Sequence, residues 1–189
     1  MSDSRAGPDP REFRNAMGLF ATGVAVIASA DGDEVVAMTA NAVSSVSLDP
    51  MLVLFCPSRK SRFAQHLAAS SGGFTINFLR HDQQALSTFF AGSWKEPAAP
   101  LFRFVPAACA PRLEGCLASL HCDREQLVEA GDHWVVIGRV RELHVGIPPH
   151  KPLVFFGGRY RHIALADSTP APDLVDVHEE PSHVFYDHW

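Results

Sequence analysis

The sequence predicts a mainly β fold, an antiparallel β-barrel with a few short helices. About seven strand-like segments are separated mostly by hairpin turns. Three short helical patterns interrupt them, too few for a sheet with alternating helices. No Gly-x-Gly-x-x-Gly fingerprint and no Walker loop occurs, which excludes Rossmann-type and P-loop nucleotide sites.

Composition restricts the class of protein further. The 189 residues are enough for one domain with a buried core, and 47% of them are hydrophobic and 20% charged. A net charge of −5 argues against nucleic acid as a partner. No apolar run reaches the roughly 18–20 residues of a membrane helix, and the N-terminus lacks the apolar core of a signal peptide. We therefore expect a cytoplasmic enzyme or small-molecule binder, with neither a membrane nor a nucleic-acid partner.

A helix is expected over residues 10–20, after a flexible leader at 1–9. Asp9 suits the N-cap and Pro10 the first helical position. The apolar residues recur three or four positions apart, at Phe13, Met17 and Phe20. This helix begins the predicted domain, which extends over 10–165.

Strands are expected where Val, Ile and Phe gather between turn residues. Asp31-Gly32 predicts one hairpin turn, and Glu129-Ala130-Gly131 predicts the turn of a much longer hairpin. In chain order the expected strands cover 23–29, 35–42, 51–56, 74–79, 113–125, 132–145 and 153–156, with a short one at Tyr160.

Two further short helices are expected, one capped by Ser61 and one over 83–90. Residues 91–112 are predicted to form a long irregular connection, which is usually functional or mobile in a small domain. Residues 166–189 hold six acidic residues and neither Lys nor Arg, so they are predicted to be an acidic tail outside the domain. The tail histidines lie five apart, which matches no helical or strand face, so no metal site is expected at His178, His183 and His188.

The four cysteines form no Cys-x-x-Cys pair, which makes a zinc knuckle or a thioredoxin-type dithiol improbable. In a cytosolic chain the expectation is reduced thiols. Cys116 and Cys122 are interpreted as two core thiols on one strand face. No metal ligand set is predicted from these residues.

Residues 38–50, MTANAVSSVSLDP, place small polar side chains where a strand core usually has Val or Ile. Small side chains let a flat ligand approach the backbone, whose N–H groups then bond to a heteroaromatic edge while hydroxyls bond to phosphate. The alternative is an ordinary Ser/Thr edge strand facing water, and composition alone favours that alternative.

This stretch, followed by the apolar strand MLVLFC, resembles the signature of the flavin reductase family. These short-chain NAD(P)H:flavin oxidoreductases are the reductase components of two-component monooxygenases. The similarity extends from Phe13 to Tyr160 in matching order and spacing. Further matching motifs are FATGVAV at 20–26, FTINFL at 74–79, LS at 86–87 with FFA at 89–91, LEGC at 113–116, GDH at 131–133, PLVFF at 152–156 and GRY at 158–160.

The resemblance implies the FMN-binding split β-barrel, a homodimer and a flavin site along residues 39–45 and the loop that follows residue 55. The residues implied to bind the flavin are Thr39, Ala40, Asn41, Ala42, Ser44, Ser45, Cys56, Pro57, Ser58, Arg59, Lys60, Ser61 and Phe90. Residues 39–42 would line the isoalloxazine ring, Ser44 and Ser45 would approach the ribityl chain and phosphate, and 56–61 would complete the phosphate site. A Ser-capped helix start beside two cations attracts a dianion. The alternatives are a solvated pair for the cations and simple core packing for Phe90.

The resemblance also implies that NADH binds beside His133 and Tyr160. His133 would position the nicotinamide without transferring a proton, and Tyr160 would close the same pocket. The alternatives are a hairpin histidine in water and a tyrosine at the edge of the core. No catalytic side chain is implied, because hydride passes directly from nicotinamide C4 to flavin N5 and the protein supplies stacking, distance and exclusion of water.

The implied activity is an NADH-dependent flavin reductase of EC 1.5.1 type, with NADPH the less favoured donor. It would reduce FAD or FMN and supply a partner monooxygenase in natural-product biosynthesis or aromatic hydroxylation. Ala42-Val43 and Met51 depart from the residues of many relatives, which leaves the preferred flavin open.

Two alternatives keep the barrel. A pyridoxamine phosphate oxidase-like FMN enzyme would need a basic cluster, whereas residues 1–165 carry only +1, the total of −5 less the −6 of the tail. A non-catalytic flavin- or haem-binding module would bind tightly without consuming NADH.

Overall fold

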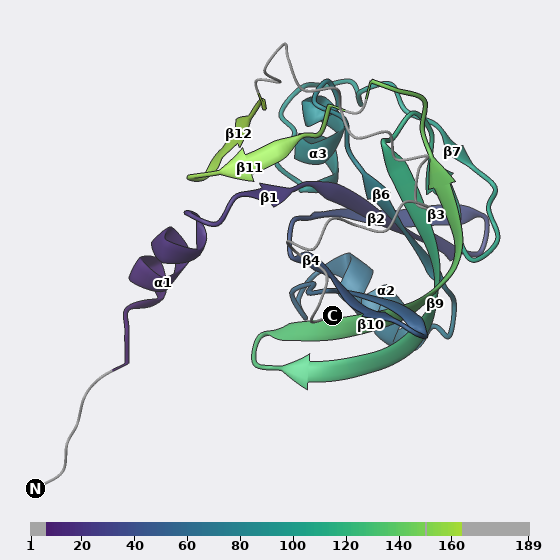
Figure 1. Cartoon of the computed structure of the whole chain (residues 1–189), viewed down its shortest axis with the longest axis horizontal. Coiled ribbons are helices and arrows are strands. Elements are labelled where there is room, and N and C mark those ends of the chain that lie inside the picture. Colours follow the sequence, from purple (N-terminus) through teal and green to yellow (C-terminus); the bar gives the residue numbers. More distant parts are fainter. Residues whose placement is uncertain (1–6, 150, 164–189) are drawn as a thin grey trace, which may run out of the picture.

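The computed structural model describes residues 7–149 and 151–163, and it confirms the predicted mainly β, antiparallel fold (Figure 1). The described helices are α1 (Pro10–Met17), α2 (Arg62–Ala69) and α3 (Gln84–Phe90). The described strands are β1 (Thr22–Gly23), β2 (Ala25–Asp31), β3 (Glu34–Ala40), β4 (Val43–Leu48), β5 (Met51–Phe55), β6 (Phe74–Phe78), β7 (Phe104–Val105), β8 (Arg112–Leu113), β9 (Ala118–Ala130), β10 (His133–Val145), β11 (Val154–Phe156) and β12 (Arg159–Arg161). The predicted acidic tail at 166–189 and most of the leader lie outside the described residues.

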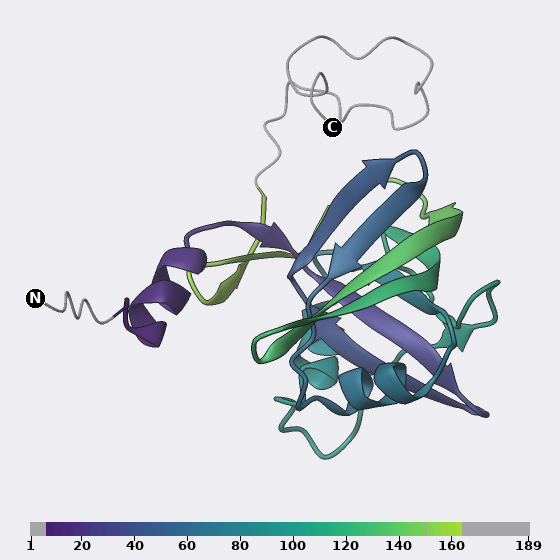
Figure 2. The same cartoon turned by 90° about the horizontal axis from the view of Figure 1, so that it is seen from below.

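A seven-stranded sheet forms the body, with the strands in the order β3-β2-β6-β9-β10-β5-β4. All neighbours in it are antiparallel, and the sheet curves round as Figure 2 shows. Its two edge strands, β3 and β4, follow each other in the chain but do not pair. The barrel is therefore split between them, and Asn41 and Ala42 form the link across the split.

The first helix is shorter than predicted. Asp9 accepts a hydrogen bond from the Arg11 N–H at 3.0 Å, which confirms the predicted N-cap. The helix ends at Met17 because Gly18 follows, a residue with low helix propensity. α1 stands away from the body, and none of its side chains is buried (Figures 1 and 2).

Two predicted strands are divided in the structure. The segment expected over 23–29 becomes β1 and β2, because Val24 leaves the ladder and its C=O accepts from the Leu79 N–H at 2.9 Å. The strand expected to begin at 113 begins at Ala118, because Leu113 pairs with Phe104 in the small β7–β8 sheet and Gly115 turns the chain with a φ of +76°. Cys116 therefore lies before the strand that holds Cys122.

The core has two parts. The first lies between the sheet and α2, where Phe55, Phe63 and Phe74 pack edge to face and Leu67 is fully buried. The second lies under α3 and joins Val24, Leu79, Leu86, Leu113 and Leu153. Cys116 and Cys122 are both buried, as expected of core thiols, and burial raises the pKa of each to about 12.

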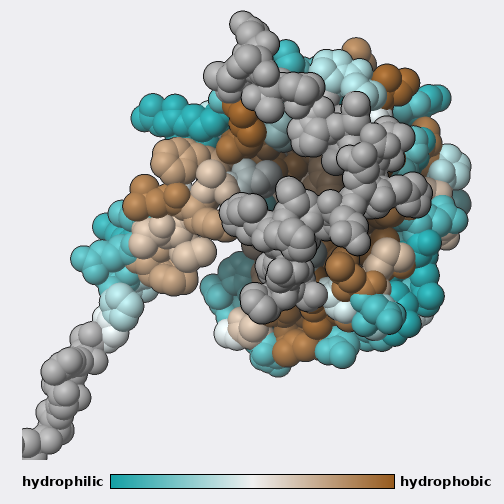
Figure 3. Space-filling model, in the orientation of Figure 1, coloured by the Kyte–Doolittle hydropathy of each residue, from teal (hydrophilic) through white to brown (hydrophobic). Residues whose placement is uncertain are grey.

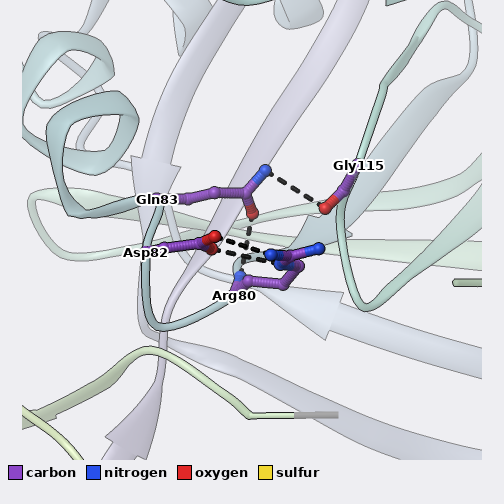
Figure 4. A network of polar contacts seen from close by, with 4 residues as sticks. All are labelled: Arg80, Asp82, Gln83 and Gly115. Carbon is purple, nitrogen blue, oxygen red and sulfur yellow. Dashed lines mark hydrogen bonds and ion pairs between the residues drawn. The ribbon is translucent and has the colours of Figure 1, made fainter. Parts of the chain in front are cut away.

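A hydrogen-bonded network fixes the turn that leads from β6 into α3 (Figure 4). The Arg80 guanidinium donates two hydrogen bonds to Asp82, which lowers the pKa of that carboxyl. The Gln83 side chain accepts from the Arg80 N–H at 2.8 Å and donates to the Gly115 C=O at 3.3 Å. The start of α3 is thereby attached to the turn that precedes β9.

The predicted loop at 91–112 is anchored by aromatic side chains. Phe102 and Phe104 pack against Phe90, with ring centroids 5.1 and 5.9 Å away. Phe89 also contacts Phe102, at 5.6 Å. The loop is therefore held on the α3 side of the barrel.

Asn77, fully buried in β6, is the polar centre of the sheet. Its amide nitrogen donates to the Val26 C=O at 2.9 Å and to the Thr75 hydroxyl at 3.0 Å. Its amide oxygen accepts from the Leu113 N–H at 2.9 Å and from the Ser119 hydroxyl at 2.8 Å. All four hydrogen-bonding positions of the amide are used, so one side chain joins β2, β6, β8 and β9.

We expect Asn77→Leu to lower the free energy of unfolding by about 3 kcal/mol or more, because a side chain of similar size leaves four buried polar groups without that partner. Urea unfolding at neutral pH measures this as a lower midpoint. The matched control is Gln65→Leu on the exposed face of α2, expected to stay within about 0.5 kcal/mol of wild type. Equal midpoints for the two variants would contradict the central role of Asn77.

Candidate functional site

The candidate site is built around residues 39–45, which cross the split between the two edge strands. Ala40 is the last residue of β3 and is paired with Ala25 of β2, while Val43 begins β4 against Phe55 of β5. The link residues Asn41 and Ala42 are exposed. Three parts of the structure adjoin this segment. They are a cleft, the loop at 56–61 and the residues around α3.

The first group is a cleft of about 490 Å³ on the open side of the barrel. Its wall includes three of the predicted flavin residues, Asn41, Ser44 and Ser45, beside apolar residues such as Val43, Leu52, Phe78 and Leu120. The Asn41 amide donates to the Thr22 hydroxyl at 3.3 Å, which ties the link residue to β1. A hollow with mostly apolar walls and a few hydroxyl and amide groups suits a flat heteroaromatic ligand.

The second group is the loop at 56–61, which lies directly beside the link. The Cys56 N–H donates to the Ala42 C=O at 3.1 Å. Ser61 caps α2 as predicted, because its hydroxyl accepts from the Ala64 N–H at 3.1 Å. The start of α2 therefore points its free N–H groups toward the loop, an arrangement that favours an anion. Burial raises the pKa of the Cys56 thiol, so it remains protonated.

The loop is attached to the tip of the long β9–β10 hairpin. The Arg59 N–H donates to the Asp132 C=O, and the Trp134 N–H donates to the Pro57 C=O, both at 3.0 Å. Ser58 and His133 form an isolated antiparallel bridge. The structure thus brings together the loop implied to bind phosphate and the histidine implied to bind NADH, although 75 positions separate Ser58 from His133 in the chain.

The Arg59 side chain also connects the 56–61 loop to the tip of the β9–β10 hairpin. The guanidinium forms an ion pair with Glu129, donates to the Gly131 C=O at 3.3 Å and lies over the Trp134 ring at 5.1 Å from its centroid. Sequence reasoning missed Glu129 and Trp134, and no local pattern marks them as partners of Arg59. Lys60 is exposed and forms no ion pair with any other described residue. Lys60 is thus the less engaged of the two predicted cations.

His133 is 44% exposed in its side chain, at the first position of β10. Its Nδ1 lies 2.8 Å from the Asp132 carboxylate, and this hydrogen bond is the main cause of the lowered pKa of Asp132. An ionised carboxylate at Nδ1 orients the imidazole ring. Nε2 forms no hydrogen bond with the described residues, so it is available to a ligand.

The third group surrounds α3 and holds the remaining predicted residues. The Thr39 hydroxyl donates to the Ser87 C=O at 2.6 Å, and the Ser87 and Tyr160 hydroxyls lie 2.8 Å apart. Tyr160 and Phe90 pack against the second core cluster. The structure therefore connects Thr39 to Tyr160 through Ser87, a residue of the matching 86–91 motif to which the sequence analysis assigned no site role. In the described part of the chain, neither Tyr160 nor Phe90 lines the cleft.

The described residues form neither a metal-binding cluster nor a membrane-spanning helix. Over residues 7–149 and 151–163, no group of three or more His, Cys, Asp or Glu side chains is placed to hold a metal ion. The three tail histidines lie outside these ranges. No helix in the described ranges has the length and apolar character needed to span a membrane.

Comparison with known proteins identifies close relatives of the whole domain. The model of the flavin reductase like domain matches residues 17–164. The reductase subunit HsaB of a flavin-dependent monooxygenase from Rhodococcus jostii is 36% identical over 169 residues, which cover 89% of this chain and 86% of HsaB.

Solved structures agree with this match. The flavin reductase PheA2 in its native state has a TM-score of 0.78 and 39% identity, covering 84% of this chain and 100% of PheA2. The NADH:FAD oxidoreductase SgcE6 of Streptomyces globisporus, in complex with NAD and FAD fragments, has a TM-score of 0.71 and 31% identity, covering 89% of this chain and 99% of that chain.

We expect Arg59→Ala to loosen the junction between loop and hairpin, because it removes the ion pair with Glu129 and the contact with Trp134. These contacts are worth about 1 kcal/mol together at a partly exposed site. Hydrogen exchange of the peptide that spans 129–134 should accelerate about fivefold. Arg62→Ala, which removes a 3.7 Å ion pair with Glu34 on the surface, is the control and should leave that peptide unchanged. Unchanged exchange in Arg59→Ala would show that the backbone bonds alone hold the hairpin.

Proposed function

Because this chain belongs to the flavin reductase like family, we propose that it transfers hydride from NADH to free FAD or FMN. The reduced flavin then leaves for a separate monooxygenase component. The observation that supports this function best is the split at residues 39–45, which places an open, mostly apolar cleft beside an anion-favouring loop. A reductase of free flavin needs both features, because its flavin must bind through ring and phosphate and then leave.

We place the flavin ring along the link, where Asn41, Ser44 and Ser45 supply polar groups in the apolar cleft. The phosphate would lie at the start of α2, held by its free N–H groups, by the hydroxyls of Ser58 and Ser61 and by Lys60. Thr39, Ala40, Ala42, Cys56 and Pro57 form the backbone that connects these two parts. When bound, the flavin supplies the ring that accepts hydride.

In this proposal Arg59 acts differently from the other loop residues. Because its guanidinium already binds Glu129 and the Gly131 C=O, it positions the hairpin that holds His133. His133 then offers Nε2 to the nicotinamide amide, while Asp132 fixes the ring from the other side. Tyr160 and Phe90 do not contact the ligand in this proposal. Tyr160 is hydrogen-bonded to Ser87, which accepts from Thr39, and Phe90 packs against the second core cluster. No proton transfer is assigned to any of these side chains.

The partner and the donor follow from the same proposal. We propose NADH as the donor in preference to NADPH, and a homodimer as the working form. HsaB is named as the reductase subunit of a monooxygenase, which supports a monooxygenase as the recipient of reduced flavin here. We also propose that the protein is cytoplasmic and that its partner monooxygenase acts in aromatic hydroxylation or natural-product biosynthesis.

The decisive experiment follows NADH at 340 nm with purified protein and with FAD, FMN or no flavin in separate reactions. We expect turnover that depends on added flavin and saturates with it, and the ratio of kcat/KM values ranks FAD against FMN. Bound flavin without NADH turnover would instead support storage or sensing. Absence of flavin binding would reject the cleft as a flavin site.

His133→Ala should raise the KM for NADH about tenfold, the effect of losing one ligand hydrogen bond, while the KM for flavin stays within twofold. Steady-state kinetics with each substrate varied separately measures both constants. His144→Ala, an exposed histidine near the other end of the same strand, is the control and should behave as wild type. A fall in flavin affinity with an unchanged KM for NADH would assign His133 to the wrong ligand.

A further inference from the structure

His121 of β9 is a buried imidazole ring to which the barrel offers no hydrogen bond. The residue is only 4% exposed, and neither of its ring nitrogens has a hydrogen-bond partner among the described residues. Buried polar atoms in folded proteins nearly always have a partner, and a buried atom without one destabilises the state that encloses it. The proposed hydride transfer does not use this ring, so its burial has a separate consequence.

Residues 109–112, here called the strap, lie over the face of the sheet from which His121 projects. Thr75 is the cross-strand neighbour of His121 in β6, so the two side chains share one face, and the Thr75 hydroxyl donates to the Pro111 C=O at 2.7 Å. Ala110 of the strap is itself buried. The strap therefore covers the imidazole and keeps water from its nitrogens.

The strap is a thin cover. Ala110 is its one buried residue, whereas Cys109, Pro111 and Arg112 are half-buried. Its end at Arg112 pairs with β7, and Figure 3 shows mostly hydrophilic residues along the right-hand edge of the molecule, the side on which β7 and β9 lie in Figure 1. Lifting the strap therefore exposes little apolar surface, so opening costs less than unfolding of the barrel.

Three charged or titratable groups act on the buried ring. Burial is the main cause that lowers the pKa of His121, and the charges of Arg112 on the strap and His144 on β10 lower it further. Glu142, the cross-strand neighbour of His121 in β10, opposes them by attracting an imidazolium. Because the pKa is lowered on balance, the ring is neutral at neutral pH beneath the closed strap.

We propose that His121 is an acid-sensitive latch: its neutral ring is enclosed beneath the strap at neutral pH, and its protonation opens residues 109–112. An imidazolium carries a charge and two N–H donors, which water solvates once the strap has lifted. Opening also removes Arg112 from the ring, whereas Glu142 stays beside it because β9 and β10 remain paired. The protonated ring is therefore more stable in the open arrangement than in the closed one.

The direction of the pH dependence follows from the two protonation equilibria. In the open state the ring takes up a proton at the ordinary histidine pKa of about 6.5, whereas in the closed state the lowered pKa delays uptake to a lower pH. The closed strap is therefore fully stable above about pH 6.5 and loses stability as the pH falls below that value.

Hydrogen exchange of the full chain, without flavin or NADH, tests the latch. We expect the protection factor of a peptide over 109–116 to fall at least about threefold between about pH 7.5 and about pH 5.5, and one proton limits the fall to about tenfold. A peptide over 51–55, in β5 and separated from β9 by β10, should keep its protection. In the described part of the chain neither the strap nor His121 lines the cleft, so this result is independent of the proposed function.

Two variants remove the titrating group. His121→Phe keeps a ring of similar shape and His121→Gln keeps a polar side chain, and in each the protection of 109–116 should be the same at both pH values. Far-UV circular dichroism verifies that each variant is folded. His144→Ala, which removes an exposed histidine of the neighbouring strand, is the matched control and should retain the wild-type fall.

NMR titration then connects the ring to the strap. The imidazole signals of His121 and the amide signal of Leu113, whose N–H donates to Asn77 beside the strap, should shift with one common midpoint below about pH 6.5. Unchanged protection in wild type, a fall that persists in both His121 variants, or separate midpoints would overturn the proposal. An equal fall in the 51–55 peptide would also overturn it, because the barrel as a whole would then be unfolding in acid.

Discussion

The split in the barrel is the constraint on which the rest of the structure depends. A closed barrel has no sheet edges, whereas here the two edges are consecutive strands that approach at Asn41 and Ala42 and do not pair. A link of only two residues can connect these strands, and both of its residues are exposed to solvent. The unpaired edges leave the link accessible, so the segment at 39–45 can form part of a binding site.

Inside the sheet, away from its two unpaired edges, a buried polar network joins several strands. Asn77 lies in β6, in the interior of the sheet order, and its amide joins four strands through hydrogen bonds in a dry environment. Buried, fully satisfied polar networks specify one arrangement of the groups they join. The Asn77 amide thus fixes β2 and β9 relative to β6, while the edges β3 and β4 remain unpaired with each other.

The sequence predicted what depends on neighbouring residues. Asp9 and Ser61 were identified as helix caps, and Gly131 as part of a hairpin turn, because each of these features is set within a few positions. The shorter α1 was missed although its cause, Gly18, is a local signal. The division at Val24 was not predicted, since it depends on a backbone bond to Leu79 that only the folded sheet creates. The partners of Arg59 were missed for the same reason, because Glu129 is 70 positions away and the topology alone brings it near.

In the candidate site, too, the residues could be selected from the sequence, whereas the contacts between distant segments could not. The resemblance selected residues 39–45, 56–61 and His133, and the structure joins these segments by backbone hydrogen bonds between Ala42, Cys56, Pro57 and Trp134. It also shows that Tyr160 is bound to Ser87, so that this residue supports the segment from the core side. Whether a residue faces a ligand or the core depends on which face of a strand is covered, and covering elements are distant in sequence.

The proposed hydride transfer by positioning places a demand on the cleft beside residues 39–45. Direct transfer between two rings needs a defined distance and the exclusion of water, because the protein contributes no acid or base to the step. The cleft is mostly apolar, with polar groups from Asn41, Ser44 and Ser45, so a flavin ring packed there would displace water from its wall. Reduced flavin could leave through the same opening, because the edge strands β3 and β4 do not pair and leave the link accessible. Binding of the flavin and its release therefore depend on one cleft.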